Sequence, residues 1–421
     1  MNTQTLSAVT AAPAWKRHWR RFAAVAGPGL VVMLADTDAG SVITAAQSGA
    51  QWGYRLLMLQ VVLIPILFVV QELTVRLGLV SGMGHGELIR RHFGRGWAWI
   101  SVGALVLACG GALLSELSGL AGVGMLFGVP AWISMPVVVF GLIAMVATRS
   151  YLSVERIALA FGAFELVFIV VAMMALRAHP QSAAMLAGSL DIPWRDTHYL
   201  YLAAANVGAV IMPWMVFYQQ SSVVEKGLAA DDLRAARWDT AIGAVLTQAI
   251  MAAVLVAVAA ALGGDGTGHA LDTVQQIAGA ITPVLGQGTG RLLFALGMSG
   301  AALVATIVVA LTAARSLGEV LGVHHRLDLA PADAPWFYGI FAAVLIAAGL
   351  VVAADVDLVS LSVGVQVMNA LLLPVVLGFL FLLARRLPEP HRLKGAYALI
   401  VGLTIVVTAG FGVYAGIAGI L

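Results

Sequence analysis

The stretch that decides the fold is GPGLVVMLADTDAGS, residues 27–41. It begins as an apolar segment and then places Asp36, Asp38 and Gly40 where the middle of a bilayer would lie. A helix from Ala24 to Ala35 rises roughly 18 Å, a little over half of a hydrocarbon core of about 30 Å. A carboxylate at that depth is costly unless it faces a cavity, a partner or a bound cation. The stretch therefore predicts a cation site at a break in a membrane-spanning helix, where Gly40 lets the backbone unwind and free its carbonyl oxygens.

The composition of the whole chain agrees with a membrane protein. Of its 421 residues, 61% are hydrophobic and only 10% are charged, and the mean hydropathy is +0.96. A soluble domain carries more charge and shorter apolar runs, so these values predict a polytopic helical membrane protein. The single cysteine, Cys109, excludes an internal disulfide and a cysteine metal cluster.

Several function classes lack their sequence signatures. The chain contains no Walker-type phosphate loop, which argues against ATP-driven transport by this chain alone. No pair of nucleophile and base stands out, so we expect no enzyme and no cofactor. We expect a divalent metal ion as substrate and the lipid bilayer as partner, no nucleic acid, and a monomer.

The apolar runs predict an all-α integral membrane protein with eleven transmembrane helices. They cover 24–51, 56–80, 97–127, 131–148, 154–176, 199–224, 241–262, 292–313, 336–353, 358–383 and 397–420. The loop 82–96 carries His85, Glu87 and two arginines, which predicts a short amphipathic piece on the membrane surface.

The basic residues predict the orientation. With a cytoplasmic N-terminus, 19 of the 23 lysines and arginines fall on the cytoplasmic side. The opposite side receives Arg55, Arg177, Arg195 and Arg291. This asymmetry favours a cytoplasmic N-terminus, an external C-terminus and a location in the cytoplasmic membrane.

A second broken helix is predicted within NVGAVIMPW, residues 206–214. Pro213 cannot donate to the helical ladder, and Gly208 loosens the chain just before it. Met212 lies roughly 20 Å along a helix that begins at Tyr199, again near mid-membrane. Two broken helices, each first in a group of five, are typical of an inverted-repeat transporter whose site lies between them. The predicted organisation is a cytoplasmic segment (1–23), two five-helix repeats (24–180 and 195–386) and an eleventh helix (394–421).

Here the residues resemble a known family, the natural resistance-associated macrophage protein (NRAMP) divalent-metal transporters. Residues 27–30 are similar to its Gly-Pro-Gly-Leu opening, and 38–41 to its Asp-Pro-Gly-Asn turn. Residues 47–54 are similar to Gln-x-Gly-Ala-Gln-x-Gly-Tyr, and 208–213 to Gly-Ala-x-x-Met-Pro. Gln366 matches a position of the family's tenth helix. The match runs in register from Gly27 to about Gly82 and returns at helices three, six and ten.

The resemblance implies a leucine-transporter-like fold and secondary transport of divalent metals by alternating access. It implies a metal site built from Asp38, the Ser41 side chain, the Met212 thioether and the carbonyls of Ala35 and Ala209, with Gln366 joining in some states. A thioether favours softer ions such as Mn²⁺ and Fe²⁺ over Mg²⁺. A Mg²⁺ transporter of a divergent branch and a same-fold transporter of an organic solute remain alternatives.

The chain also departs from the family pattern. The turn's proline is Ala39 and its asparagine is Ser41, while two helix-six histidines are Trp214 and Gln219. On helix three Glu116 matches a family acid, but the acid one turn earlier is replaced by Leu113.

These replacements leave two alternatives open, an uncoupled transporter or a proton route through other acids. Asp36, Glu116, Glu72 and Glu165 are the candidates for such a route, although a helical Glu72 would instead pair with Arg76 at i, i+4. Asp36 shares the site with Asp38 if the segment is unwound, whereas on a helix it points about 160° away.

Overall fold

A computed structural model describes residues 25–147, 151–178, 192–262, 270–322, 329–354 and 357–421. The predicted cytoplasmic segment 1–23 and the repeat boundaries at 24 and 180 lie outside these ranges. Within them the fold is entirely helical. The first half comprises α2 (Pro28–Asp36), α3 (Ala39–Trp52), α4 (Leu57–Ser81), α5 (His85–Phe93), α6 (Arg95–Leu126), α7 (Ala131–Val146), α8 (Tyr151–Gly162), η1 (Ala163–Leu166) and α9 (Val167–Ala178).

The second half is built in the same way from long apolar helices. It comprises α11 (Thr197–Val210), α12 (Pro213–Glu225), η3 (Ala230–Asp232), α13 (Leu233–Ala261), α14 (Val274–Leu285), α15 (Gln287–Leu321), α16 (Pro335–Ala353), α17 (Leu358–Ala384) and α18 (Gly395–Ile420).

The number of candidate membrane spans is close to the number predicted from the sequence. In the described part of the chain nine helices are long and apolar enough to cross a membrane, or ten when α2 and α3 count as one bent span. The expected span at 131–148 corresponds to α7, which has only 16 described residues. The count of eleven is therefore not confirmed, whereas the all-α membrane architecture is.

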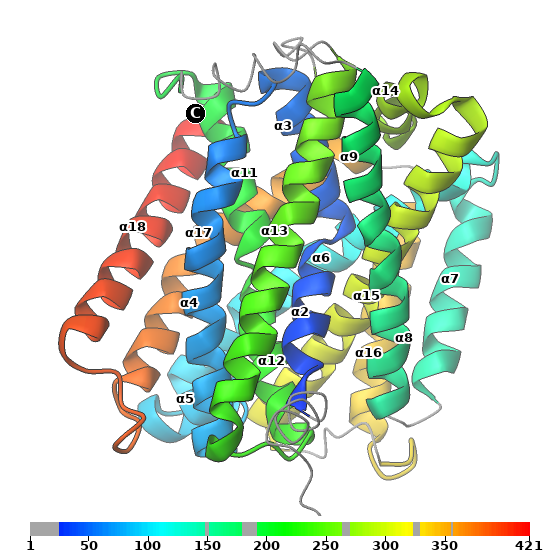
Figure 1. Ribbon diagram of the computed structural model, residues 1–421. Helices are drawn as coiled ribbons and strands as arrows, with labels where there is room; N and C mark the ends of the chain where they lie inside the picture. Colours follow the sequence, from blue (N-terminus) through cyan, green and yellow to red (C-terminus); the bar gives the residue numbers. More distant parts are fainter. Residues whose placement is uncertain (1–24, 148–150, 179–191, 263–269, 323–328, 355–356) are drawn as a thin grey trace, which may run out of the picture.

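The helices run nearly side by side in one bundle, with α18 at one edge and α7 at the other (Figure 1). In this view α3 lies above α2 and α11 above α12, so each broken span has an upper and a lower half. Helix α6 packs against α15, and α11 packs against α17 and α18. The broken spans are thereby enclosed by the long helices, while the apolar faces of α7 and α18 remain exposed.

Exposed tryptophans mark both ends of the bundle. Trp97, Trp238 and Trp336 lie near the starts of α6, α13 and α16, at the end predicted to be cytoplasmic. Trp132 and Trp194 precede or open spans that begin at the other end. Tryptophan concentrates at membrane interfaces, so exposed tryptophans at the two ends of the bundle agree with a bundle that spans a bilayer.

The predicted amphipathic piece is α5. Leu88 and Ile89 are buried and Arg91 is exposed. Helix α5 lies at the end of the bundle opposite to the C-terminus (Figure 1).

Candidate metal site

The first break lies where the sequence predicted it. Helix α2 ends at Asp36, α3 begins at Ala39, and the two are bent by 47°. The Asp38 carboxylate caps α3 by accepting a hydrogen bond from the Ser41 N–H, 2.6 Å from N to Oδ1. The Ala39 N–H does not complete the helical bond to the Ala35 carbonyl, because it donates to Glu116 Oε2 at 2.9 Å. The Ala35 carbonyl therefore loses its usual donor four residues ahead.

The second break frees a carbonyl by a different route. Helix α11 ends at Val210 and α12 begins at Pro213. Proline has no N–H, so the Ala209 carbonyl also lacks a donor four residues ahead. It accepts instead from the Ser41 hydroxyl, 3.0 Å from Oγ to O. This hydrogen bond joins the two broken spans directly.

Met212 lies between the two halves of the second broken span and is fully buried. Its extended backbone conformation (φ −87°, ψ 138°) marks the interruption. The indole N–H of Trp214, also fully buried, donates to the Met212 sulfur at 3.3 Å.

Gln366 of α17 reaches the first break. A Cβ added to Gly40 would lie 2.3 Å from Gln366 Nε2 and 2.6 Å from the hydroxyl of Ser115 on α6. Glycine at position 40 is thus what allows α6 and α17 to approach the start of α3. The Gln366 side-chain oxygen accepts from Asn369 at 2.9 Å.

Buried polar atoms without partners gather around these breaks. Within the described residues, no hydrogen bond to an ordinary donor or acceptor is found for Asp38 Oδ2, Glu116 Oε1, Ser115 Oγ or Gln366 Nε2, and the Asp38 and Glu116 carboxyl groups lie within hydrogen-bonding reach of each other. Each of these four side chains is fully buried. Buried polar groups are nearly always paired, so such a cluster indicates that a polar ligand or water belongs there.

The donor set differs from that of a structural metal site. No group of three or more His, Cys, Asp or Glu side chains could hold a metal ion in the parts of the chain described. An ion between the breaks would rely on Asp38, on hydroxyl and amide side chains, on the freed carbonyls of Ala35 and Ala209 and on the Met212 thioether. Oxygen donors suit hard divalent cations, and the sulfur extends the set toward softer ones.

The comparison with known families agrees with this site. A family model described as natural resistance-associated macrophage protein-like matches residues 29–418. The chain belongs to this family. As a member of it the protein is a transporter and not an enzyme.

Bacterial NRAMP relatives are similar along most of their length. A protein of Xanthomonas campestris pv. campestris named divalent metal cation transporter MntH is 28% identical over 317 residues, covering 72% of this chain and 70% of the relative. A protein of the same name from Bradyrhizobium diazoefficiens is 26% identical over 320 residues, covering 73% and 70%.

Solved structures share the fold. A manganese transporter of Eremococcus coleocola aligns with a TM-score of 0.74 at 19% identity, covering 99% of this chain and 92% of that one. The transporter MhsT, solved with L-phenylalanine, aligns with a TM-score of 0.61 at 15% identity, covering 94% and 97%. The leucine-transporter-like fold with two interrupted spans is thereby confirmed.

Three of the departures from the NRAMP pattern have a structural counterpart. A proline at position 39 would have no N–H for Glu116, whereas Ala39 donates one. Trp214, in place of a family histidine, contacts the Met212 sulfur. Gln219, in place of another, donates to Thr240 of α13 at 3.1 Å.

The additional acids have different surroundings. Asp36 is the last residue of α2, so it is helical, and its Oδ1 has no partner within the described residues. Glu165 lies in η1, a 3-10 turn between α8 and α9, and neither of its oxygens has a geometrically acceptable partner in the described chain. The Thr37 hydroxyl beside it is bonded to Thr247. Glu72 forms the expected ion pair with Arg76 at 2.8 Å and a further one with Arg237 at 2.7 Å.

Sequence reasoning missed the groups that hold the lower end of α2. Asp239 Oδ2 of α13 accepts from the N–H groups of Gly27 and Gly29, at 3.2 and 2.8 Å. Lys226 donates to the Ala26 carbonyl and pairs with Glu155 at 2.9 Å. The available signal was a lone carboxylate early in an apolar span. The N–H groups that bond to it lie more than 200 residues away in the sequence, so no local spacing pointed to them.

The opposite end of the first span is closed by neutral groups. Gln47 of α3 donates to the Leu271 carbonyl at 2.5 Å and accepts from its N–H at 3.0 Å. These residues line a cavity of about 240 Å³ at that end of the bundle, together with Gln51 and His198. Hydrogen bonds and an ion pair thus hold the first broken span to its neighbours at both of its ends.

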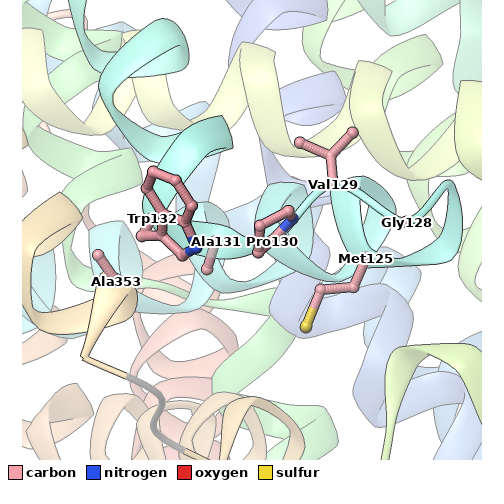
Figure 2. Close-up of a pocket in the computed structure, with 7 residues that line it drawn as sticks. All are labelled: Met125, Gly128, Val129, Pro130, Ala131, Trp132 and Ala353. Carbon is pink, nitrogen blue, oxygen red and sulfur yellow. The ribbon is translucent and has the colours of Figure 1, made fainter.

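A larger cavity lies elsewhere. Its volume is about 430 Å³ and it is bordered by the connection between α6 and α7 and by the end of α16. Figure 2 shows Trp132 and Ala353 near each other at this cavity. None of its lining residues belongs to the predicted ligand set, so it is separate from the metal site.

Proposed function

We propose that this protein is a secondary transporter of divalent metal ions and that it works by alternating access. The observation that carries the proposal is the Asp38 carboxylate, which is fully buried beside the Glu116 carboxyl group where two interrupted helices meet. A carboxylate at mid-membrane is costly unless a cation or another polar partner binds it. Membership of the NRAMP family, and the metal transport stated in the names of its relatives, support the same cargo class.

The proposed ligands are Asp38, the side chain of Ser41, the Met212 sulfur and the carbonyls of Ala35 and Ala209, with Gln366 joining as the helices move. The family's manganese transporter and the soft sulfur favour Mn²⁺ and Fe²⁺ as cargo. All these ligands come from one chain, so a monomer suffices for transport.

Mg²⁺ is the second candidate cargo. The Ser41 hydroxyl, which replaces a family amide, is occupied by the Ala209 carbonyl. An ion that keeps part of its water shell would leave this hydrogen bond intact, and Mg²⁺ retains its waters more firmly than Mn²⁺.

We further propose that transport is not coupled to protons through the second broken helix. The two positions that carry histidines in the family hold Trp214 and Gln219, neither of which titrates. Acidification that accompanies metal entry would instead assign the proton route to Asp36, Glu116 or Glu165.

The proposed location is the cytoplasmic membrane, with a cytoplasmic N-terminus and an external C-terminus. The bacterial relatives and the asymmetry of basic residues support this placement.

The proposal is tested with purified protein in liposomes that contain a metal-sensitive and a pH-sensitive fluorophore. We expect Mn²⁺ to enter faster than Mg²⁺ and the internal pH to stay constant. Asp38→Asn preserves the shape but removes the charge, and should reduce initial Mn²⁺ uptake by more than about tenfold, since breaking a charged contact costs more than about 1.4 kcal/mol. The matched control is Asp333→Asn, an exposed acid in the connection before α16. Equal uptake by both variants would remove Asp38 from the site.

A further inference from the structure

The contact between Trp214 and Met212 bears on which metal the site prefers. The indole nitrogen lies 3.3 Å from the sulfur, and both side chains are fully buried. An indole N–H is a donor only, and a thioether sulfur is a weak acceptor. Because both side chains are buried, water does not compete for the sulfur lone pair, and the indole N–H remains its hydrogen-bond donor.

This hydrogen bond affects how much electron density the sulfur can give to a metal ion. When a metal ligand donates a hydrogen bond to an outer partner, its basicity rises and it binds metal more tightly. Here the candidate ligand accepts the hydrogen bond, so the effect reverses and the sulfur gives less electron density to an ion. The loss falls on soft ions, because hard ions gain little from a thioether in the first place.

Resting on the proposed function, we propose that Trp214 is a specificity-determining residue that weakens the Met212 thioether as a ligand and shifts the cargo preference from soft toward harder divalent cations. Trp214 acts through Met212 and not on the ion. It is therefore a positioning residue, and its effect requires the sulfur.

The site has the geometry for this separation of roles. Trp214 belongs to the first turn of α12, one residue beyond Pro213. Ala209, whose carbonyl is bonded to Ser41, precedes the break on α11. The indole N–H that contacts the sulfur thus comes from α12, whereas the Ala209 carbonyl comes from α11, so different halves of the broken span supply the hydrogen-bond donor and an oxygen ligand.

The test compares Cd²⁺, a soft ion, with Mn²⁺ as reference. Apparent affinities are measured by uptake into liposomes for the unmodified protein, Trp214→Phe, Met212→Leu and the double variant. Removal of the N–H in Trp214→Phe should raise the preference for Cd²⁺ over Mn²⁺ by about 3- to 10-fold, the worth of one hydrogen bond. In the Met212→Leu background the same substitution should leave this ratio unchanged.

A second variant separates the N–H from the volume of the ring. Benzothienylalanine at position 214 keeps the bicyclic shape and lacks the donor, so it should reproduce the Trp214→Phe ratio even if the smaller ring disturbs packing. An unchanged or lower Cd²⁺ preference in this variant overturns the proposal. So does an equal rise in the Met212→Leu background. Failure of the unmodified protein to take up either ion would instead defeat the proposed function itself.

Discussion

Single residues free the two carbonyls at the site by opposite means. Pro213 has no N–H, so the release of the Ala209 carbonyl was predictable from the sequence. Ala39 has an N–H and gives it to Glu116, 77 residues away, which spacing alone could not reveal. The position of a break is thus encoded locally, while the partners that stabilise it are set by the tertiary fold.

Other residues show the same division. The ion pair of Glu72 with Arg76 followed from helical spacing, but the second partner, Arg237, lies 165 residues away. The contact of Trp214 with the Met212 sulfur required the unwound backbone between them, because residues two apart on a helix do not face each other.

A buried histidine on the surface helix α5 predicts a pH dependence of stability. Burial lowers the pKa of His85 from 6.5 to about 4, although a hydrogen bond with Gln220 opposes the shift. The folded protein keeps His85 neutral, whereas the unfolded chain takes up a proton below about pH 6.5. This contribution to stability is complete above pH 6.5 and is lost as the pH falls toward 4, by about 2 kcal/mol at pH 5.

Thermal unfolding in detergent at pH 7.5 and pH 5 checks this expectation. The control is His85→Asn, which can still bond to Gln220 but does not titrate. The unmodified protein should lose more thermal stability at pH 5 than the variant does. An equal loss in both would show that other groups dominate.

At the scale of helices, the sequence predicted which helices form and where two of them are interrupted, but it did not predict their finer geometry. Hydropathy placed the described spans to within several residues, and both interruptions fell at the predicted positions. The 3-10 turn η1 at 163–166 had no sequence signal, since neither glycine nor proline lies inside it. Which glycine meets which helix required the structure, because spacing along one helix does not identify the helix that packs against it.

The contact between α11 and α17 gives a prediction at this scale. A Cβ added at Gly208 would lie 1.8 Å from the Gln366 carbonyl oxygen, a backbone atom that cannot rotate away. Gly208→Ala should therefore push these helices apart, lowering stability by at least about 1–3 kcal/mol and reducing metal uptake.

Gly378→Ala on α17 is the matched control. Nothing lies within 4 Å of a Cβ at that position, and alanine is the better helix former. Thermal unfolding and Mn²⁺ uptake should be close to those of the unmodified protein. If Gly208→Ala behaved in the same way, the close approach of the two helices would be disproved.

For the whole molecule, hydropathy predicted the membrane class, the motifs around the two breaks predicted the family, and the basic residues predicted an orientation. This orientation can be tested once the single cysteine is removed. Cys109 is buried, so Cys109→Ala provides a silent background. Asp272→Cys precedes α14 at the end predicted to be external, and Glu389→Cys lies between α17 and α18 at the end predicted to be cytoplasmic. Both positions are exposed.

In intact cells a membrane-impermeant maleimide should label Asp272→Cys and spare Glu389→Cys until the membrane is opened. A permeant maleimide, which should label both, serves as the control for reactivity. The reverse pattern would place the N-terminus outside.

The two closures of the first span differ in kind, and this has a consequence for the cell. The lower one is held by Asp239 and by the pair of Lys226 with Glu155, the upper one by the neutral amide contacts of Gln47. In the proposed alternating-access cycle, breaking the contacts at one end does not require breaking those at the other, because no group is shared between them. Transport by that cycle would leave no continuous water path between the two faces, so the membrane would keep its voltage.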